Sequence, residues 1–460
     1  MFSIEAKTKP SFWEALSIVA IIIMMISTAI GGLGAKPHIP ILFAIILLIF
    51  YGLAKRVPFK ALEESMLSGA KAGMGAVYIF FLIGLLISSW IVSGTIPTIL
   101  YMGLSIVSAS LFYTIVFIIT AIIGTAIGSS LTTVATIGVA FMSIGGAIDA
   151  SLALTAGAIV SGAFVGDKMS PLSDTTNLAA SIVHIDLFEH IKNMCWTTVP
   201  AFILSAIFYA VFSPSVGEID ANAISSYQSS LLDTNFIHWY ALVPLVVLIV
   251  CTLLKIPAFL TLIISSFVAL VLSTLHTSFS LAEYCEILYS GYVSHTGIEV
   301  IDILLTRGGI SSMYFTIMLV LLSLSMGGLL FALGIIQTLL SKMEKLLTSI
   351  GALITGTAFT AIGINTLVGE QYLSILLTGE AFKQKYAEKG LHPKNLSRVM
   401  EDAGTVVNPL VPWSVCGIYI AEMLDVPVMS YFPFAFFCLL SPILTIVFGW
   451  LNITITKQKI

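Results

Sequence analysis

Long apolar segments alternate with short polar ones along almost the whole of this 460-residue protein. Many of the apolar segments approach or exceed the roughly 18–20 residues that an α-helix needs to cross a bilayer. Others are too short and are expected to be half-helices or re-entrant segments, so the pattern predicts about 11 to 14 helical segments. The apolar segments lie near residues 11–34, 39–54, 74–96, 111–127, 130–148, 151–166 with 178–189, 195–213, 237–254, 257–275, 312–335, 348–365, 366–379, 394–404 with 412–425, and 428–452.

Composition supports a membrane protein. Hydrophobic residues make up 58% of the sequence and charged residues only 10%, whereas soluble domains carry about 25% charged residues. The first apolar run, Phe12 to Leu33, is too long for the core of a signal peptide and is expected to be a spanning helix. The five cysteines are scattered and odd in number, which favours small buried side chains over a disulfide or metal framework. The predicted fold class is an all-α polytopic membrane protein.

The charged residues predict an orientation. If the N-terminus is cytoplasmic, nearly every lysine and arginine falls in a cytoplasmic loop, as the positive-inside rule requires. Only Lys36 and Arg307 then lie outside, and the external loops 214–235 and 276–311 are acidic. We therefore expect a multi-pass protein of the inner (cytoplasmic) membrane with both termini in the cytoplasm.

Weak internal similarity suggests two related halves. IVSGTIPTILY (91–101) resembles FALGIIQTLLS (331–341), GTAIGSSLTTVA (124–135) resembles GTAFTAIGINTL (356–367), and GDKMSPL (166–172) matches EDAGTVVNPL (401–410). Basic loops in one half correspond to neutral loops in the other, as expected for inverted-topology repeats with broken helices near the membrane midplane. The predicted division is 1–213 for the first repeat, 214–236 for an external linker and 237–460 for the second repeat. Chance similarity between apolar segments is the alternative.

The most polar stretch inside an apolar region is GDKMSPLSDTTN at 166–177. Pro171 breaks the helix, and the freed carbonyls and side-chain oxygens suit a small hard cation such as sodium, by the logic of oxygen-liganded cation sites. The candidate ion- or substrate-binding residues here are Asp167, Ser170, Asp174, Thr175, Thr176 and Asn177. Of these, Asp167, Asp174 and Asn177 are the predicted Na⁺ ligands.

The second half carries a matching interruption, EDAGTVVNPLVPWS at 401–414, with candidates Asp402 and Asn408. An intramembrane carboxylate is costly and is by default a functional hypothesis. One such carboxylate can hold either a proton or a sodium ion, and this competition is the basis of cation/proton exchange. Further candidates are Asn365, Glu370, Glu401 and Trp413.

Structural alternatives remain open for these residues. Asp174 would also serve as the N-cap of the following helix, Lys168 could pair with Asp167, and Arg398 could pair with Asp402. Asn365 could form an ordinary helix–helix hydrogen bond. His184 and His190 could sense pH, although their position favours a surface role.

No P-loop, HExxH, GxSxG or nucleotide-binding glycine motif occurs in the sequence. We therefore expect no enzymatic activity, no cofactor and no nucleic-acid partner. The expected partners are the lipid bilayer, Na⁺ and H⁺; a homodimer and a small carboxylate or amino acid substrate stay open.

The runs GDKMSPLSDTTNLA and DLFEHIKNM (186–194), with the later EDAGTVVNPLVPW, resemble the NhaC-type sodium/proton antiporter family over essentially the whole sequence. The resemblance implies a secondary transporter that couples sodium and proton gradients. Some members of the family resemble exchangers of malate and lactate, and others resemble amino acid transporters.

The predicted function is therefore exchange of sodium for protons, with Asp167 as the shared carboxylate. The alternative is sodium- or proton-coupled transport of an organic acid or amino acid. In that case the broken helix ends would bind a substrate carboxylate, and Trp413 and Tyr419 would suit the larger ligand. A channel or passive scaffold is disfavoured by the paired acidic breaks.

Overall fold

A computed structural model describes residues 6–72, 74–106, 111–171, 173–213, 228–254, 256–295, 302, 305–343 and 347–458. Within these ranges the protein is helical, apart from an isolated β-bridge between Leu391 and Lys457. Most of the predicted linker, 214–227, lies outside the described residues. The α-helices are α1 (Phe12–Ser27), α2 (His38–Ala54), α3 (Phe59–Ala72), α4 (Met74–Val92), α5 (Thr95–Ile106), α6 (Phe112–Ile127), α7 (Ser130–Thr133), α8 (Val139–Ala147), α9 (Leu152–Met169), α10 (Asp174–Ile182), α11 (Leu187–Phe212), α13 (Val243–Leu253), α14 (Ala258–Ser273), α15 (Leu281–Ser290), α17 (Tyr314–Ala332), α18 (Ile335–Met343), α19 (Ile350–Val368), α20 (Gln371–Glu388), α21 (Lys394–Met400), α22 (Val415–Leu424), α23 (Val428–Tyr431) and α24 (Phe436–Leu451).

The prediction of an all-α polytopic membrane protein is confirmed. Among the described residues, five helices are long and apolar enough to cross a bilayer, and two bent helix pairs would raise this number to seven. Five shorter apolar helices accompany them. Large apolar side chains on the outer surface of α11, including Trp196, Ile203 and Val211, are more than half exposed. Such exposure is unusual in soluble proteins and fits a lipid-facing surface.

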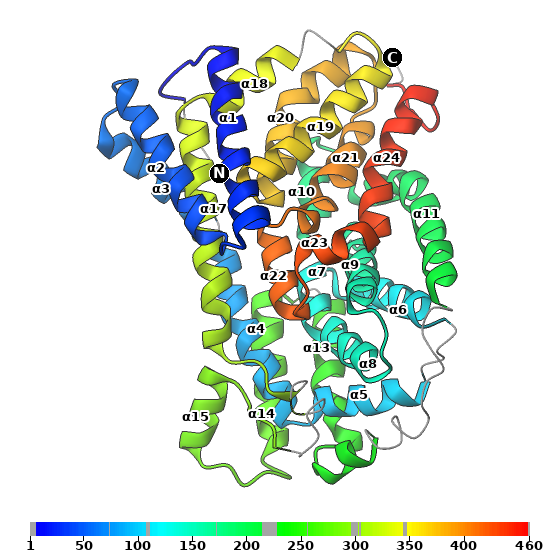
Figure 1. Cartoon of the computed structure of the whole chain (residues 1–460). Coiled ribbons are helices and arrows are strands. Elements are labelled where there is room, and N and C mark those ends of the chain that lie inside the picture. The colour runs from blue at the N-terminus through cyan, green and yellow to red at the C-terminus, as the bar shows by residue number, and fades with distance from the viewer. Residues whose placement is uncertain are drawn as a thin grey trace.

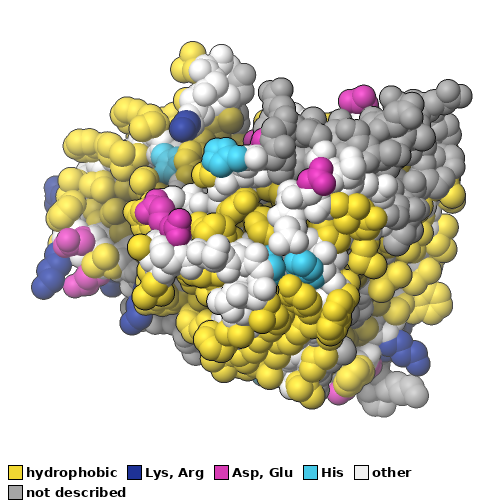
Figure 2. Space-filling model, turned by 90° about the horizontal axis from the view of Figure 1, so that it is seen from below, with side chains coloured by type: hydrophobic (Ala, Val, Ile, Leu, Met, Phe, Trp, Pro, Cys, Tyr) yellow, Lys and Arg dark blue, Asp and Glu magenta, His cyan; other side chains and the backbone are white. Residues whose placement is uncertain are grey.

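Figure 1 gives the arrangement of the helices. Helices α18, α19, α20 and α21 and the C-terminus lie toward the upper end, and α5, α14 and α15 lie toward the lower end (Figure 1). We call these ends the upper face and the lower face. Seen from the lower face, acidic side chains and histidines lie among hydrophobic ones, and most basic side chains lie toward the edge of the view (Figure 2).

Two helical hairpins have similar tips. The first joins α6 to the helix that runs from α7 through a π-helical turn at Val134–Gly138 into α8, and the second joins α19 to α20. Gly128 and Gly369 end α6 and α19 in the left-handed conformation, with φ of 74° and 73°. Their N–H groups donate to the carbonyls of Gly124 and Asn365, both at 2.8 Å. Glycine is the residue that adopts this conformation at little cost.

The two tips pair different positions of the halves than the sequence similarity does in this region. Gly124 and Asn365 occupy the same place in their hairpins, whereas the sequence similarity matches Gly124 with Gly356. The match of 91–101 with 331–341 fits the local structure, because Gly94 and Gly334 each follow a long helix with φ of 78° and 67°. That the halves are inverted repeats stays a prediction.

The helices pack in two groups. In the first group, α3 and α2 pack against α17, and α4 and α13 pack against α14. In the second, α9 packs against α6 and α24, α11 and α19 pack against α24, and α10 and α21 pack against α20. We call these the α17 group and the α9 group. The predicted interruptions of the helices are both present in the α9 group, between α9 and α10 and between α21 and α22.

Candidate functional site

Asp167 lies in the last turn of α9 with its carboxylate held between two serine hydroxyls. Ser130 Oγ donates to Oδ2 at 2.7 Å, and Ser173 Oγ donates to Oδ1 at 2.6 Å. The side chain is 4% exposed, and the described residues provide no ion-pair partner for it. Ser130 is the first residue of α7, so the carboxylate lies at a helix N-terminus, where the backbone dipole favours negative charge.

The hydroxyl groups beside Asp167 organise the break between the two helices. Thr176 Oγ1 from α10 donates toward the carbonyls of Asp167 and Lys168, at 3.3 and 3.1 Å, which satisfies carbonyls at the end of α9. Thr175 Oγ1 lies 3.0 Å from Ser173 Oγ. The side chain of Ser170 is fully buried at the C-cap of α9. Ser170, Thr175 and Thr176 thus lie within the same buried polar region as Asp167.

Asp174 and Asn177, the other two predicted Na⁺ ligands, are exposed. The Asn177 amide donates to the carbonyls of Pro171 and Ser173, at 3.0 and 2.8 Å. The interpretation of Asp174 as an N-cap is wrong, because Ser173 is the N-cap of α10 and its Oγ accepts from the N–H of Thr176. Asp174 is instead the first residue of α10, one residue beyond the serine that holds Asp167.

Lys168, next to Asp167, forms a buried ion pair with Asp402 from the second break. Both side chains are fully buried. Asp402 Oδ1 also accepts from Ser441 Oγ on α24 at 2.7 Å and from Thr197 Oγ1 on α11 at 3.1 Å. The alternative pairing of Lys168 with Asp167 is therefore wrong. The two consecutive residues of α9 therefore have different partners: Lys168 pairs with the carboxylate of Asp402, whereas Asp167 accepts hydrogen bonds from two serine hydroxyls.

Arg398 does not pair with Asp402, contrary to the second alternative. Its guanidinium donates to the carbonyl and the hydroxyl of Thr454 near the C-terminus, at 3.3 and 2.9 Å. The cationic partner of Asp402 is instead Lys168, which lies on α9. The ion pair thereby connects the two broken segments across 234 residues of sequence.

Two further acids lie near this region. Glu401 is fully buried beside Thr405, and Asp167, Lys168 and Asp402 all act on it electrostatically. Glu370 caps α20, and its Oε2 accepts from the N–H of Leu373 at 2.8 Å. Glu370 thus caps the helix that follows the second tip, just as Ser129 caps the helix that follows the first tip.

The remaining candidates fasten the second hairpin to the second break. Asn408 Nδ2 donates to Asn365 Oδ1 at 2.9 Å, and Asn365 Nδ2 donates to the carbonyl of Gly404 at 2.5 Å. Trp413 Nε1 donates to the carbonyl of Thr366 at 2.6 Å. The structure thus gives Asn365, Asn408 and Trp413 positioning contacts, and the hydrogen bond expected as the alternative for Asn365 is present.

Sequence reasoning missed three residues of the site: Ser130, Thr197 and Ser441. Ser130 lies in GTAIGSS, which stands out only as a repeat, whereas Ser173 is among the oxygen-bearing residues expected at the break. Ser441 and Thr197 stand alone in apolar helices and offer no local signal. Only the fold brings them to Asp402.

The described residues contain no group of three or more His, Cys, Asp or Glu side chains that could hold a metal ion. Asp167 is accompanied instead by hydroxyl groups and backbone carbonyls. Each hydroxyl can turn its hydrogen to the carboxylate or a lone pair to a cation.

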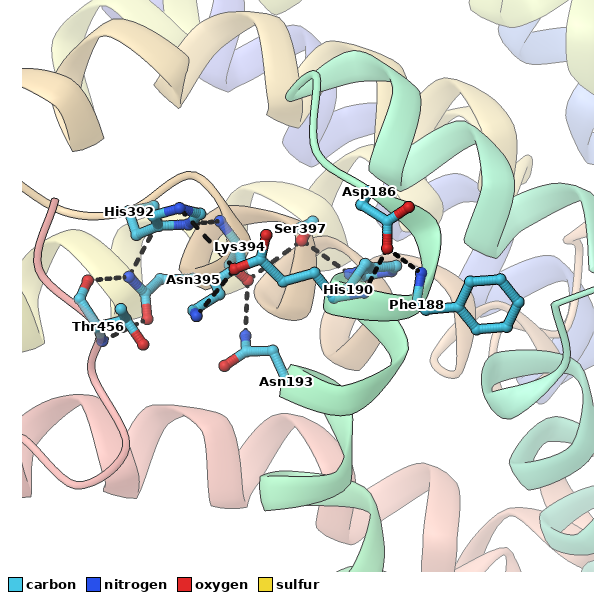
Figure 3. Close-up of polar contacts among 10 residues, drawn as sticks. Asp186, Phe188, His190, Asn193, His392, Lys394, Asn395, Ser397 and Thr456 are labelled. Carbon is cyan, nitrogen blue, oxygen red and sulfur yellow. Dashed lines mark hydrogen bonds and ion pairs between the residues drawn. The ribbon is translucent and has the colours of Figure 1, made fainter. Parts of the chain in front are cut away.

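The upper face carries a separate polar cluster, formed by α11, the start of α21 and the C-terminal segment (Figure 3). Glu189 lies 3.1 Å from Lys394 Nζ, and Ser397 Oγ lies 2.8 Å from His190 Nδ1. His190 is fully buried, so the expectation of a surface position is wrong for this residue. The cluster ties the start of α21 to α11.

Interrupted helices around a buried carboxylate that has no ion-pair partner among the described residues are typical of secondary transporters. The sequence profile of the Na⁺/H⁺ antiporter family matches residues 162–453. The protein is 40% identical to the Na⁺/H⁺ antiporter NhaC of Alkalihalophilus pseudofirmus over 96% of each sequence. It is 34% identical to the arginine/ornithine antiporter ArcD of Halobacterium salinarum, over 97% of this protein and 93% of that one. It is also 32% identical to the malate-2H⁺/Na⁺-lactate antiporter of Bacillus subtilis, over 96% and 95%. The protein belongs to the Na⁺/H⁺ antiporter family.

Proposed function

We propose that this protein exchanges sodium ions for protons across the cytoplasmic membrane, with Asp167 as the carboxylate that the two cations share. The observation that carries the proposal is the setting of Asp167: buried, held by two hydroxyls at a helix N-terminus, and without an ion-pair partner among the described residues. A carboxylate that is already paired with a cationic side chain is neutralised, so it would attract a transported cation only weakly. Family membership and the name of the NhaC relative support the same function.

The two aspartates of the breaks then have different roles. Asp402 is neutralised by Lys168 and held by two hydroxyls, so it stabilises the packing of α9 against α21, α11 and α24. Of these two aspartates, Asp167 is therefore the one left for exchange. Asp402 and Asn408, predicted as ligands from their sequence positions, act in this proposal by holding the second break in place.

The proposal is tested in everted vesicles with a pH-sensitive dye and an established proton gradient. Addition of sodium should dissipate the gradient in the wild type, and Asp167→Asn should abolish the response. Asp149→Asn is the matched control, because Asp149 is exposed in a turn with φ of 51°, a conformation that asparagine tolerates. A wild-type rate and apparent sodium affinity in Asp167→Asn would rule out this assignment.

The names of two relatives favour a second candidate, in which an organic solute is exchanged together with the ions. The same vesicles discriminate between the two. A sodium-dependent proton signal without any organic solute supports simple exchange, whereas silence until a carboxylate or amino acid is added supports coupled solute transport.

We also propose that the upper face is cytoplasmic. It carries the C-terminus and the basic residues Lys383, Lys385, Lys389 and Lys394, as the positive-inside rule expects. In a background in which the five native cysteines are replaced, a membrane-impermeant thiol reagent should therefore label Lys457→Cys, at an exposed position, in everted vesicles but not in intact cells. The reverse result would invert the orientation.

A further inference from the structure

A cavity of about 430 Å³ lies near the lower face, lined by residues of α4, α8, α15, the segment between α15 and α17, and the end of α22. It is distinct from the Asp167 site, because its lining includes no residue of that site; the apolar part of the lining includes the buried side chains Ile87, Val139 and Met423. Its polar lining comes from two separate segments. Arg307 and Tyr292 come from the segment between α15 and α17, and Glu422 and Asp425 come from the end of α22.

Arg307 is fixed in place by the backbone around it. Gly308 and Gly309 have φ of 91° and 84°, and Gly309 N–H donates to the carbonyl of Gly84 on α4 at 3.0 Å. A Cβ atom at Gly309 would lie 2.4 Å from the backbone nitrogen of Gly291, so only glycine fits there. The segment that carries Arg307 thus packs tightly against α4, and the guanidinium is directed to the cavity from a rigid support.

One guanidinium N–H of Arg307 donates to the carbonyl of Met423 at 3.0 Å. An arginine side chain has five such donors in a planar fork that matches a carboxylate. The bond to Met423 therefore orients the guanidinium at the cavity wall and leaves donors for a ligand.

Charged side chains of both signs line the cavity, namely Arg307, Glu422 and Asp425, and Asp425 lies close enough to Arg307 to act on it electrostatically. Lys36 is held over the ring of Phe315 at 5.5 Å and lies close enough to Glu422 to act on it electrostatically. Among the described residues, no ion pair joins Lys36 or Arg307 to Glu422 or Asp425. Lys36 and Arg307 are also the two basic residues that the charge pattern assigns to the external side. Arg307 lines the cavity, and Lys36 lies near Glu422 at its edge.

This balance decides the class of ligand. A cation alone would be repelled by Arg307 and Lys36, and an anion alone would be repelled by Glu422 and Asp425. A ligand that carries both charges is complementary to both pairs, and the volume is sufficient for a small organic molecule. We propose that the cavity is a binding site for the zwitterionic head of an α-amino acid, with its carboxylate on Arg307 and its ammonium on Glu422 and Asp425.

The position of the site gives binding a mechanical consequence. The carboxylate would be held by the segment before α17 and the ammonium by the end of α22, so a bound ligand would draw these two elements together at the lower face. Ligands that bind between two bodies favour their closure. This inference deepens the second candidate function, and it is measured by binding, which does not depend on sodium-driven proton flux.

The test uses the purified full-length protein in nanodiscs. Thermal unfolding is recorded with each of the twenty L-α-amino acids, and with lactate and methylammonium as probes that carry one charge each. We expect at least one amino acid to raise the unfolding temperature in a saturable way and the two single-charge probes to have no effect. Arg307→Lys, which keeps the charge but loses the fork, should raise the apparent Kd at least tenfold, as should Glu422→Gln.

Arg56→Gln is the matched control, because Arg56 is exposed on another part of the molecule, and it should bind as the wild type does. Sodium-driven proton flux of every variant reports whether it is folded. The proposal is overturned if no amino acid binds, if lactate or methylammonium alone binds as well, or if Arg307→Lys and Glu422→Gln bind with unchanged affinity. Because flux and binding are separate readouts, failure of this proposal leaves sodium/proton exchange intact.

Discussion

The ion pair between Lys168 and Asp402 makes a quantitative prediction. Both side chains are fully buried, so removing either partner leaves an uncompensated charge in a water-free region. Two unit charges about 4 Å apart attract each other by about 4 kcal/mol at an effective dielectric constant of about 20. Breaking a buried pair by removing one partner typically costs about 3–5 kcal/mol. We expect Lys168→Met and Asp402→Asn each to destabilise the protein by an amount in this range.

The double variant Lys168→Met/Asp402→Asn should recover much of this loss. The asparagine oxygen can still accept from Ser441 and Thr197, which hold Oδ1 of Asp402 in the native protein. The two effects should therefore fall short of additivity by about 2 kcal/mol or more, beyond the range expected for independent sites. The apparent unfolding temperature is read from size-exclusion profiles of heated, detergent-solubilised samples, and each single variant should unfold about 3–5 °C below the wild type.

Two results would refute the reasoning. If the losses of the single variants simply add in the double variant, the ion pair makes no energetic contribution. If the double variant is stable but has no sodium-driven proton flux, Asp402 takes part in exchange and is not only a structural partner of Lys168. Flux retained in the double variant and absent in Asp167→Asn would separate the two aspartates as proposed.

Three further predictions concern packing, pH and the second hairpin. Gly166→Ala should impair folding, because a Cβ atom there would lie 2.4 Å from the carbonyl carbon of Gly124 on α6. Expression yields and size-exclusion profiles test this, with Gly146→Ala as the control because a Cβ atom at Gly146 meets only open space. Equal yields of the two variants would contradict the prediction. Burial lowers the pKa of His276 near the lower face, and the neighbouring His238 lowers it further. The hydrogen bond to the carbonyl of Val92 raises the pKa, but by less than burial lowers it. The unfolded state therefore binds the proton more readily, so this contribution to stability is full above the ordinary pKa and is lost as the pH falls through and below it. The unfolding temperature should fall on acidification toward about pH 5, and less steeply in His276→Gln; an unchanged slope in the variant would contradict the assignment. Asn408→Ala removes the hydrogen bond to Asn365 and the acceptor for the N–H of Cys416, and should lower the free energy of unfolding by about 2 kcal/mol or more. The sodium dependence of any residual flux should stay unchanged. An altered apparent sodium affinity would instead make Asn408 a ligand.

The location of the site is predictable because its signals are local. A proline, two aspartates and several hydroxyl residues inside an apolar region predict the break at 166–177, and α9 does end there. The partners of the charged residues are not predictable in the same way. Lys168 has Asp167 beside it in sequence, but its side chain projects from α9 toward Asp402 on a different element. Neighbours along a helix differ by about 100° in direction, so adjacency in sequence says little about pairing.

The hairpins show a different limit. The sequence predicts separate apolar segments at residues 111–127 and 130–148, and the structure has them. Hydropathy does not show that they form one hairpin with its tip beside Asp167, because both arms are equally apolar. The capping signals at the tip, a left-handed glycine followed by Ser129 or Glu370, are short and become informative only when both hairpins are compared.

If transport requires the α17 group and the α9 group to move relative to each other, a covalent bond between them should stop exchange. The structure offers a matched pair of positions for this test. A Cβ atom at Gly327 on α17 would lie 3.6 Å from Cβ of Val368 on α19, and one at Gly379 on α20 would lie 3.6 Å from Cβ of Ile182 on α10. Both separations are within the range for a disulfide. The first pair joins the two groups, and the second lies within the α9 group.

In a background in which the five native cysteines are replaced, oxidation of Gly327→Cys/Val368→Cys should abolish sodium-driven proton flux, and reduction should restore it. Oxidation of Ile182→Cys/Gly379→Cys should leave the flux unchanged, because its two helices belong to one group. Mobility shifts on a gel give the cross-linked fraction in each case. Full flux from a completely oxidised 327–368 pair would mean that the helices around Asp167 open the site without moving against α17, and the path to either face would then have to form within the α9 group alone.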